Sequence, residues 1–269
     1  MTGPPSAPGI ARRFGEARAA GRKLLVPYLT AGFPDRARCA EVLTGLAEAG
    51  ADAIELGVPF SDPLADGPVI AAASERAIAA GTTIGGAIGI GAEYVAGGAD
   101  RPPLVLFTYL NPVISAGADR IADACRTAGF GAILIADLPF DEDPDVARAF
   151  SDRDLPLVRL AAPTTSAARL AELARGAEGF VYLIARTGVT GAGAGTDDRT
   201  VEQVATIRAV TDLPVVVGFG IGGPAEAARA ARVADGVVVG SAFVDRLERE
   251  GPAAALAWMR SIRAAIDAG

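Results

Sequence analysis

The chain of 269 residues contains no histidine, and only two cysteines, two methionines and one tryptophan. The absence of histidine excludes histidine-dependent catalytic triads and the commonest zinc sites. Proton transfer near neutral pH must therefore use carboxyl, tyrosine, lysine or cysteine side chains. Cys39 and Cys125 have neither metal-binding nor redox spacing, and each falls in a segment with helical periodicity. We expect two reduced thiols in a cytoplasmic protein.

Positive charge is also scarce, with 25 Lys and Arg against 32 Asp and Glu and a net charge of −7. The basic residues are scattered singly or in pairs, which argues against a nucleic-acid partner. No apolar run approaches the roughly 20 residues that a membrane-spanning helix needs. Residues 1–9 are rich in Pro, Gly and Ser without a secretory hydrophobic core, so we expect a flexible tail and no membrane partner.

Aromatic residues make up only 6% of the chain, and its 51% hydrophobic content comes mainly from short aliphatic runs. Eight such runs alternate with segments of helical spacing. They are continuous rather than alternating, which is typical of parallel strands buried on both faces. The runs are Leu24–Thr30, Ala53–Val58, Leu104–Leu110, Ala132–Leu138, Leu157–Ala162, Phe180–Ala185, Pro214–Phe219 and Gly236–Val244.

This rhythm predicts an α/β protein, a (β/α)8 TIM barrel, with an extra N-terminal helix over Ile10–Ala20. A doubly wound open sheet is the structural alternative. No linker or change of composition divides the chain, so we expect residues 10–269 to form a single barrel domain.

The second run carries a carboxyl group where burial is costly. If Ile54 and its alternate neighbours face the helices, Glu55 faces the barrel mouth, where apolar walls would raise its pKa into the range of a general acid or base. The alternative is an inward ion pair, with Arg159 as the plainest partner. Asp66 fits a catalytic role or the N-cap of a helix starting near Pro68 equally well.

Glycine-rich turns follow the last strands of the predicted barrel. Gly218–Gly223 leads into a Pro-initiated helix, and Gly240 precedes Ser241. Barrels of this kind bind phosphate after strands 7 and 8, where glycine lets backbone N–H groups approach an anion. Ordinary tight turns without a ligand are the alternative. A third glycine tract, Gly188–Gly195, is a candidate mobile lid.

The motifs "ELGVPFSDPLADGP", "DLPFDE", "APTTS", "RTGVTGA", "GFGI" and "VVVGSAFV", in this order and spacing, resemble the alpha subunit of tryptophan synthase over nearly the whole chain. The resemblance implies a lyase that cleaves 1-C-(indol-3-yl)glycerol 3-phosphate to indole and D-glyceraldehyde 3-phosphate. It implies no metal and no cofactor on this chain. The implied partner is a pyridoxal-phosphate beta subunit in an alpha2-beta2 heterotetramer.

The same resemblance implies roles for individual residues. The catalytic pair would be Glu55 and Asp66. The remaining implied sets are an indole pocket of Tyr28, Phe107, Tyr182 and Ile70; phosphate contacts at Gly191, Gly220, Gly240 and Ser241; a lid with Thr190 and Arg186; and a partner interface with Pro59 and Asp62.

Two departures from the family pattern, Ala71 and Ala185, keep open a stand-alone lyase that releases free indole. A low-activity barrel that activates a partner is a separate alternative, against which Glu55 and Asp66 argue. A different phosphosugar isomerase of the same fold is a weaker alternative.

Overall fold

The computed structural model describes residues 9–184, 198–218 and 220–269, and its eight strands form a closed parallel barrel in sequence order. This confirms the predicted fold class. The strands are β1 (Leu24–Thr30), β2 (Ile54–Gly57), β3 (Leu104–Thr108), β4 (Ala132–Ile135), β5 (Leu157–Ala161), β6 (Val181–Ile184), β7 (Val215–Gly218) and β8 (Gly236–Val239). Of the predicted tail, only Gly9 lies within the described residues.

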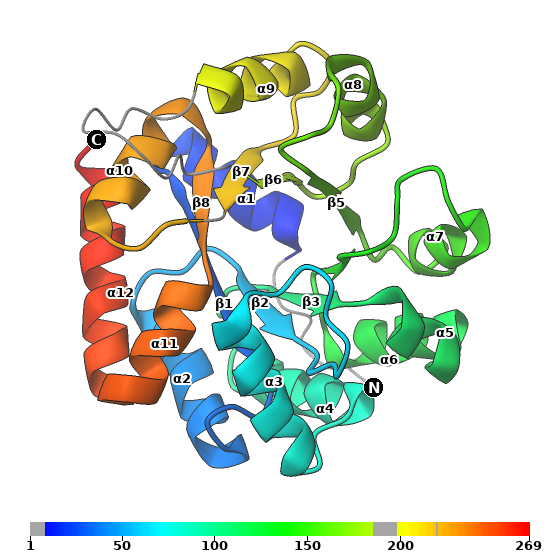
Figure 1. Cartoon of the computed structure of the whole chain (residues 1–269), viewed down its shortest axis with the longest axis vertical. Helices are drawn as coiled ribbons and strands as arrows, with labels where there is room; N and C mark the ends of the chain where they lie inside the picture. Colours follow the sequence, from blue (N-terminus) through cyan, green and yellow to red (C-terminus); the bar gives the residue numbers. More distant parts are fainter. Residues whose placement is uncertain (1–8, 185–197, 219) are drawn as a thin grey trace.

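Twelve helices lie within the described residues, most of them arranged around the strands (Figure 1). They are α1 (Ile10–Ala19), α2 (Arg36–Glu48), α3 (Pro68–Ala79), α4 (Ile84–Ala96), α5 (Leu110–Ala116), α6 (Ala118–Ala128), α7 (Pro144–Ser151), α8 (Ala167–Arg175), α9 (Asp198–Arg208), α10 (Pro224–Val233), α11 (Ser241–Glu250) and α12 (Pro252–Asp267).

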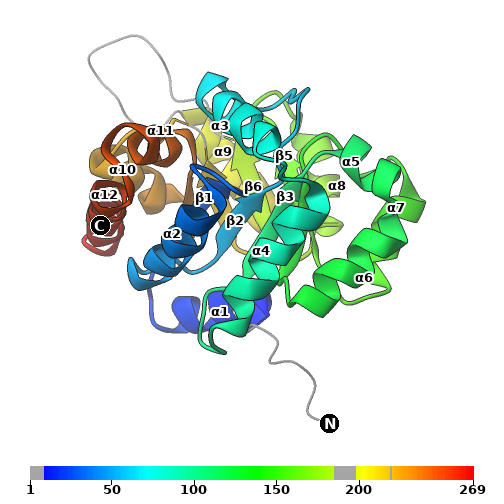
Figure 2. The same ribbon diagram turned by 90° about the horizontal axis from the view of Figure 1, so that it is seen from below.

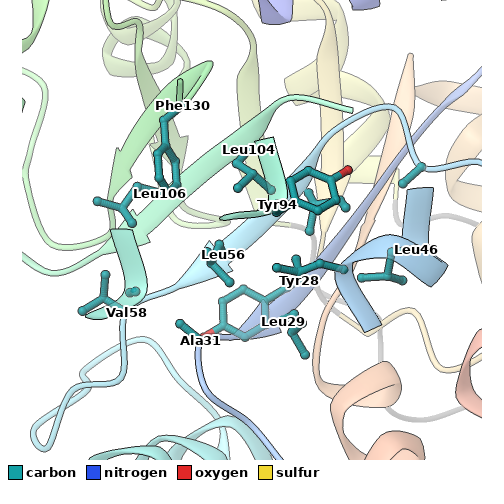
Figure 3. Close-up of a cluster of buried hydrophobic side chains, with 14 of the residues drawn as sticks. Tyr28, Leu29, Ala31, Leu46, Leu56, Val58, Tyr94, Leu104, Leu106 and Phe130 are labelled. Carbon is teal, nitrogen blue, oxygen red and sulfur yellow. The ribbon is translucent and has the colours of Figure 1, made fainter. Parts of the chain in front are cut away.

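Side-chain alternation along the strands separates two apolar layers. Ile54 and Leu56 of β2 pack outward against the helices, whereas Ala53 belongs to the cluster inside the barrel. Figure 3 shows part of the outer layer, where Leu56 and Leu104 lie near Tyr94 of α4. The same alternation turns Glu55 toward the barrel axis, as predicted.

The extra helix α1 closes the N-terminal end of the barrel. Its buried residues Ile10, Phe14 and Ala17 join the cluster inside the strands, and the Phe14 ring lies 5.5 Å from that of Phe180. Figure 2 shows α1 at the end of the barrel opposite α3. Because this end is plugged by apolar side chains, a ligand must enter from the other end, where the strand C-termini lie.

Several predicted strands were too long, among them the fourth, which ends at Ile135 and not at Leu138, and two of them run into the helix that follows. The eighth was expected to reach Val244, but it ends at Val239 and α11 begins at Ser241. The third was expected to reach Leu110, where α5 begins instead. In both places an apolar run continues across the turn, so hydrophobicity alone does not reveal the change from strand to helix.

Candidate active site

A cavity of about 380 Å³ opens at the C-terminal end of the barrel. Its walls come from strand ends and from the loops that follow β2, β7 and β8. Nine residues predicted for the site line it together: Tyr28, Glu55, Asp66, Ile70, Phe107, Tyr182, Gly220, Gly240 and Ser241. The structure thus assembles in one place residues that are spread over more than 200 positions of the chain.

Glu55 lies at the bottom of this cavity and is only 1% exposed. Its Oε1 has no hydrogen-bond partner among the described residues. Burial without a compensating cation disfavours the charged form and raises the pKa of Glu55 to about 8. The carboxyl is therefore protonated near neutral pH and is free to donate its proton to a bound molecule.

The expectation that Arg159 could neutralise Glu55 is wrong. Leu160, its neighbour in β5, lines the active-site cavity, so Arg159 faces outward and lines a separate cavity beside Glu178. The physical reason is the two-residue period of a strand, which turns adjacent side chains to opposite faces. No lysine or arginine is found among the described residues that line the active-site cavity.

Asp66 does not cap a helix, contrary to one of the two expectations. The N-cap of α3 is Gly67, with no side-chain cap bond. The Tyr109 hydroxyl hydrogen-bonds the Asp66 carboxyl and also accepts the N–H of Ala65 at 3.2 Å. Burial raises the pKa of Asp66, and the bond from Tyr109 partly opposes that rise. The carboxyl is thus held in a fixed place at the cavity edge.

Two glycines make room for the aromatic side chains of the cavity. A Cβ at Gly57 would lie 2.1 Å from the Tyr28 hydroxyl, and one at Gly218 would lie 2.3 Å from the Tyr182 hydroxyl. Any side chain at these positions would displace the rings. Tyr28 also meets Phe107 edge-on, with ring centroids 5.4 Å apart and planes at 86°. Together they form an apolar slot above Glu55 that suits a flat aromatic ligand.

The far side of the cavity is built from helix N-termini. Gly220 has a left-handed φ of +78°, and the turn that follows leads into α10. Gly240 is the N-cap of α11, so the N–H groups of Ser241 and Ala242 have no intrahelical acceptor. Gly220, Gly240, Ser241 and Ala242 all line the cavity. Free N–H groups at helix N-termini are an anion site, and a short helix after β8 is a recurring phosphate site of barrels.

Five other residues were predicted, for the lid, a phosphate contact and the partner interface. Arg186, Thr190 and Gly191 lie outside the described residues. Pro59 is buried and Asp62 is exposed, in the loop between β2 and α3. The exposed part of that loop also carries Leu64, which is 87% exposed.

The contact between Tyr109 and Asp66 was not predicted from the sequence, and neither was the place of Leu160, Ile221 and Val238 in the cavity walls. Strand alternation could have found Leu160 and Val238, which lie at inward positions. No local signal identifies Tyr109, because its contact with Asp66 joins residues 43 positions apart through the closure of the barrel.

In the described part of the chain, no group of three His, Cys, Asp or Glu side chains lies close enough to hold a metal ion. None of the helices there combines the length and the apolar character that crossing a bilayer requires.

The fold and the cavity define a (β/α)8 barrel in which a buried carboxyl with a raised pKa shares one cavity with aromatic side chains and a helix N-terminus. The family model described as tryptophan synthase alpha chain matches residues 14–264. The chain belongs to the tryptophan synthase alpha chain family.

Individual relatives agree over nearly full length. The tryptophan synthase alpha chain of Synechococcus elongatus is 44% identical over 256 residues, which are 94% of this chain and 95% of that protein. The solved alpha subunit from Legionella pneumophila has a TM-score of 0.87 at 32% identity, covering 97% of this chain and 98% of that one. A Mycobacterium tuberculosis tryptophan synthase structure has a TM-score of 0.87 at 37% identity, covering 98% and 100%.

Proposed function

We propose that this cavity cleaves 1-C-(indol-3-yl)glycerol 3-phosphate to indole and D-glyceraldehyde 3-phosphate, with Glu55 and Asp66 as its catalytic residues. The chain is a tryptophan synthase alpha chain by family, and alpha chains are lyases of this reaction. They need no cofactor of their own, because pyridoxal phosphate belongs to the beta chain. The observation that carries the residue assignment is the buried, unpaired Glu55 with its raised pKa.

The reaction needs a proton at C3 of the indole and removal of the proton from the adjacent glycerol hydroxyl. Glu55 donates its proton to C3, and the ring becomes an electron sink. The Glu55 carboxylate then takes the proton of the glycerol hydroxyl. The C–C bond breaks, and the electron pair of that bond returns to the indole ring. One proton is given and one is recovered, so Glu55 ends in its starting form and no outside reactant is required.

Asp66 stabilises the intermediate that this protonation creates. A positive charge develops on the indole nitrogen, and an ionised carboxylate at the cavity edge accepts the indole N–H. Tyr109 supports this role because its hydroxyl fixes the carboxyl and favours the ionised form. Tyr28 and Phe107 hold the ring by apolar contact, and Tyr182 and Ile70 complete the pocket.

The phosphate binds at the N-terminus of α11 and the turn after β7. Free N–H groups at Ser241 and the backbone near Gly220 and Gly240 provide the contacts. With no basic side chain in the described lining, recognition depends on backbone geometry. The predicted contact at Gly191 and the predicted lid residues Thr190 and Arg186 belong to the same proposal.

The partner is a tryptophan synthase beta subunit. For its docking surface we propose the loop after β2, with Asp62 exposed and Pro59 shaping the loop from within. Leu64, which is 87% exposed, lies on the same loop and adds an apolar contact to this proposed surface. We also propose one domain over residues 10–269, and a cytoplasmic location in keeping with the free buried thiols of Cys39 and Cys125.

The experiment is an assay of indole release from indoleglycerol phosphate, with and without a beta subunit, for the wild type and Glu55→Gln. We expect stimulation by the beta subunit and a loss of at least about 100-fold in kcat for the variant. A variant that keeps most of the turnover would overturn the role of Glu55. Fast turnover that the beta subunit does not change would favour the stand-alone lyase. Tight substrate binding without cleavage would favour the activator.

A further inference from the structure

A second cavity, of about 320 Å³, lies on the outer side of the barrel where α7 packs beside β5 (Figure 1). It is lined by Arg159 and Leu157 of β5, by Glu178 before β6, and by Phe140 and other residues around α7. Arg159 precedes Leu160, which lines the active-site cavity, so strand β5 separates the two. Neither the catalytic residues nor the expected beta-subunit surface contributes to it.

Arg159 is the feature that needs an explanation. It is 9% exposed, and its Nε and Nη1 are buried without a hydrogen-bond partner among the described residues. Burial lowers the pKa of its guanidinium, with the Glu178 charge opposing this. A buried, unpaired guanidinium costs stability, whereas an apolar side chain at an outward strand position would pack against the helices at no such cost. A charged guanidinium at this position therefore indicates a ligand that accepts hydrogen bonds from Nε and Nη1 of Arg159.

The other charges around the cavity decide which ligand fits. Asp141 already accepts a hydrogen bond from Arg169 at 2.8 Å, and Arg148 pairs with Asp145 at 3.2 Å. Glu142 is a further acid of the lining. Glu178 lines the cavity together with Arg159, but no salt bridge joins these two described residues, and the Glu178 Oε2 accepts the Leu157 N–H at 3.0 Å. A simple anion at Arg159 would therefore lie near an acid with spare acceptor capacity.

We propose that this cavity binds a free α-amino acid with an apolar side chain. Its carboxylate accepts hydrogen bonds from Nε and Nη1 of Arg159, and its ammonium group faces Glu178. The two charges of an α-amino acid are separated by one carbon, so a single molecule bridges two protein charges that do not pair directly. The side chain packs on Phe140, Pro144 and Ala147, which supply the apolar wall.

The test titrates the full chain with L-leucine and with its two halves, 4-methylpentanoate, which lacks the ammonium group, and 3-methylbutylamine, which lacks the carboxylate. Binding is followed by calorimetry and by the NMR signal of the Arg159 Nε–H. We expect L-leucine to shift that signal and to bind at least tenfold more tightly than either half. Equal binding of 4-methylpentanoate would show a plain anion site and overturn the proposal, as would no L-leucine binding up to about 50 mM.

Variants separate binding from folding. Arg159→Met keeps the length of the side chain without its charge, so we expect lost L-leucine binding with an unchanged or higher melting temperature. Arg148→Met, at the rim of the same cavity, is the matched control and keeps binding within twofold. Glu178→Gln keeps an acceptor for the Leu157 N–H and weakens L-leucine binding while sparing that of 4-methylpentanoate. Undiminished binding by Arg159→Met would overturn the site.

Discussion

Tyr28 of β1 lies directly opposite Glu55 of β2 in the parallel ladder, and both side chains enter the same cavity. The Tyr28 hydroxyl accepts a hydrogen bond from Thr30 Oγ1 at 3.4 Å. It lies over Gly57, which is two residues after Glu55 and therefore on the same face of β2. This arrangement shields the carboxyl from water, and burial raises the pKa of both groups. A strand position that looks unfavourable for a carboxylate is thus suitable for a carboxylic acid.

The first prediction concerns stability. Since the pKa of Glu55 is about 8 in the folded chain against 4.5 as the ordinary value, folding favours its protonated form. Its contribution is fully present below pH 4.5 and is lost as the pH rises to about 8. Glu55→Gln cannot ionise, so we expect it to match the wild type near pH 4 and to exceed it by on the order of 3 kcal/mol at pH 7.

Urea unfolding at several pH values measures this difference. The control is Glu41→Gln, which changes an exposed carboxyl of α2 and leaves the wild-type pH dependence in place. A difference between Glu55→Gln and the wild type that stays constant from pH 4 to pH 8 would contradict the raised pKa.

The second prediction concerns the pH dependence of the reaction. Protonation of C3 needs the acid form of Glu55, so kcat/KM falls above about pH 8. The low-pH limb belongs to Asp66, which must be ionised. Tyr109→Phe removes the hydrogen bond that lowers the pKa of Asp66, so we expect the low-pH limb to move to higher pH while the high-pH limb stays.

The matched control is Tyr94→Phe in α4. Its hydroxyl is buried without a partner among the described residues and does not line the active-site cavity, so the pH profile should not change. If Tyr109→Phe lowers the rate equally at every pH, Tyr109 acts by packing and not through the Asp66 carboxyl.

Much of this arrangement could be predicted from the sequence because strands have a strict period. Alternation along β2 is enough to turn Glu55 inward, and continuous apolar runs are enough to indicate parallel strands. The partner of Asp66 could not be predicted, since Tyr109 reaches it only once the barrel closes. For Arg159 the same period was not applied. Its neighbour Leu160 faces the barrel interior, so Arg159 must face outward and could not have paired with Glu55.

The third prediction concerns the anion site at α11. Ser241→Asp places a negative charge at the helix N-terminus where the phosphate is expected, and like charges there repel. We expect KM to rise by on the order of 100-fold, with a smaller change in kcat. Ser241→Ala, which removes one hydroxyl, should raise KM by only about 3- to 10-fold.

Steady-state kinetics of indole release provide the measurement. Ser261→Asp in α12 changes the net charge equally at an exposed position that does not line the cavity, and should leave KM unchanged. Equal effects of the two aspartates would mean that overall charge, and not a local phosphate contact, controls substrate binding.

The last prediction concerns the space that Gly57 leaves for Tyr28. Gly57→Ala would put a Cβ within 2.6 Å of three atoms of the Tyr28 side chain, including its hydroxyl. The ring must then move into the cavity, so we expect a loss of about 100-fold in kcat/KM, the size of effect that misplacing a catalytic site by about 1 Å produces. The added Tyr28→Leu change should restore part of the lost activity by relieving the contact, although Tyr28→Leu alone lowers it. Gly89→Ala in α4 is the control, because its Cβ meets nothing within 4 Å and alanine favours a helix interior by about 1 kcal/mol. If Tyr28→Leu gives no recovery in the Gly57→Ala background, the loss arises from β2 itself and not from the displaced ring.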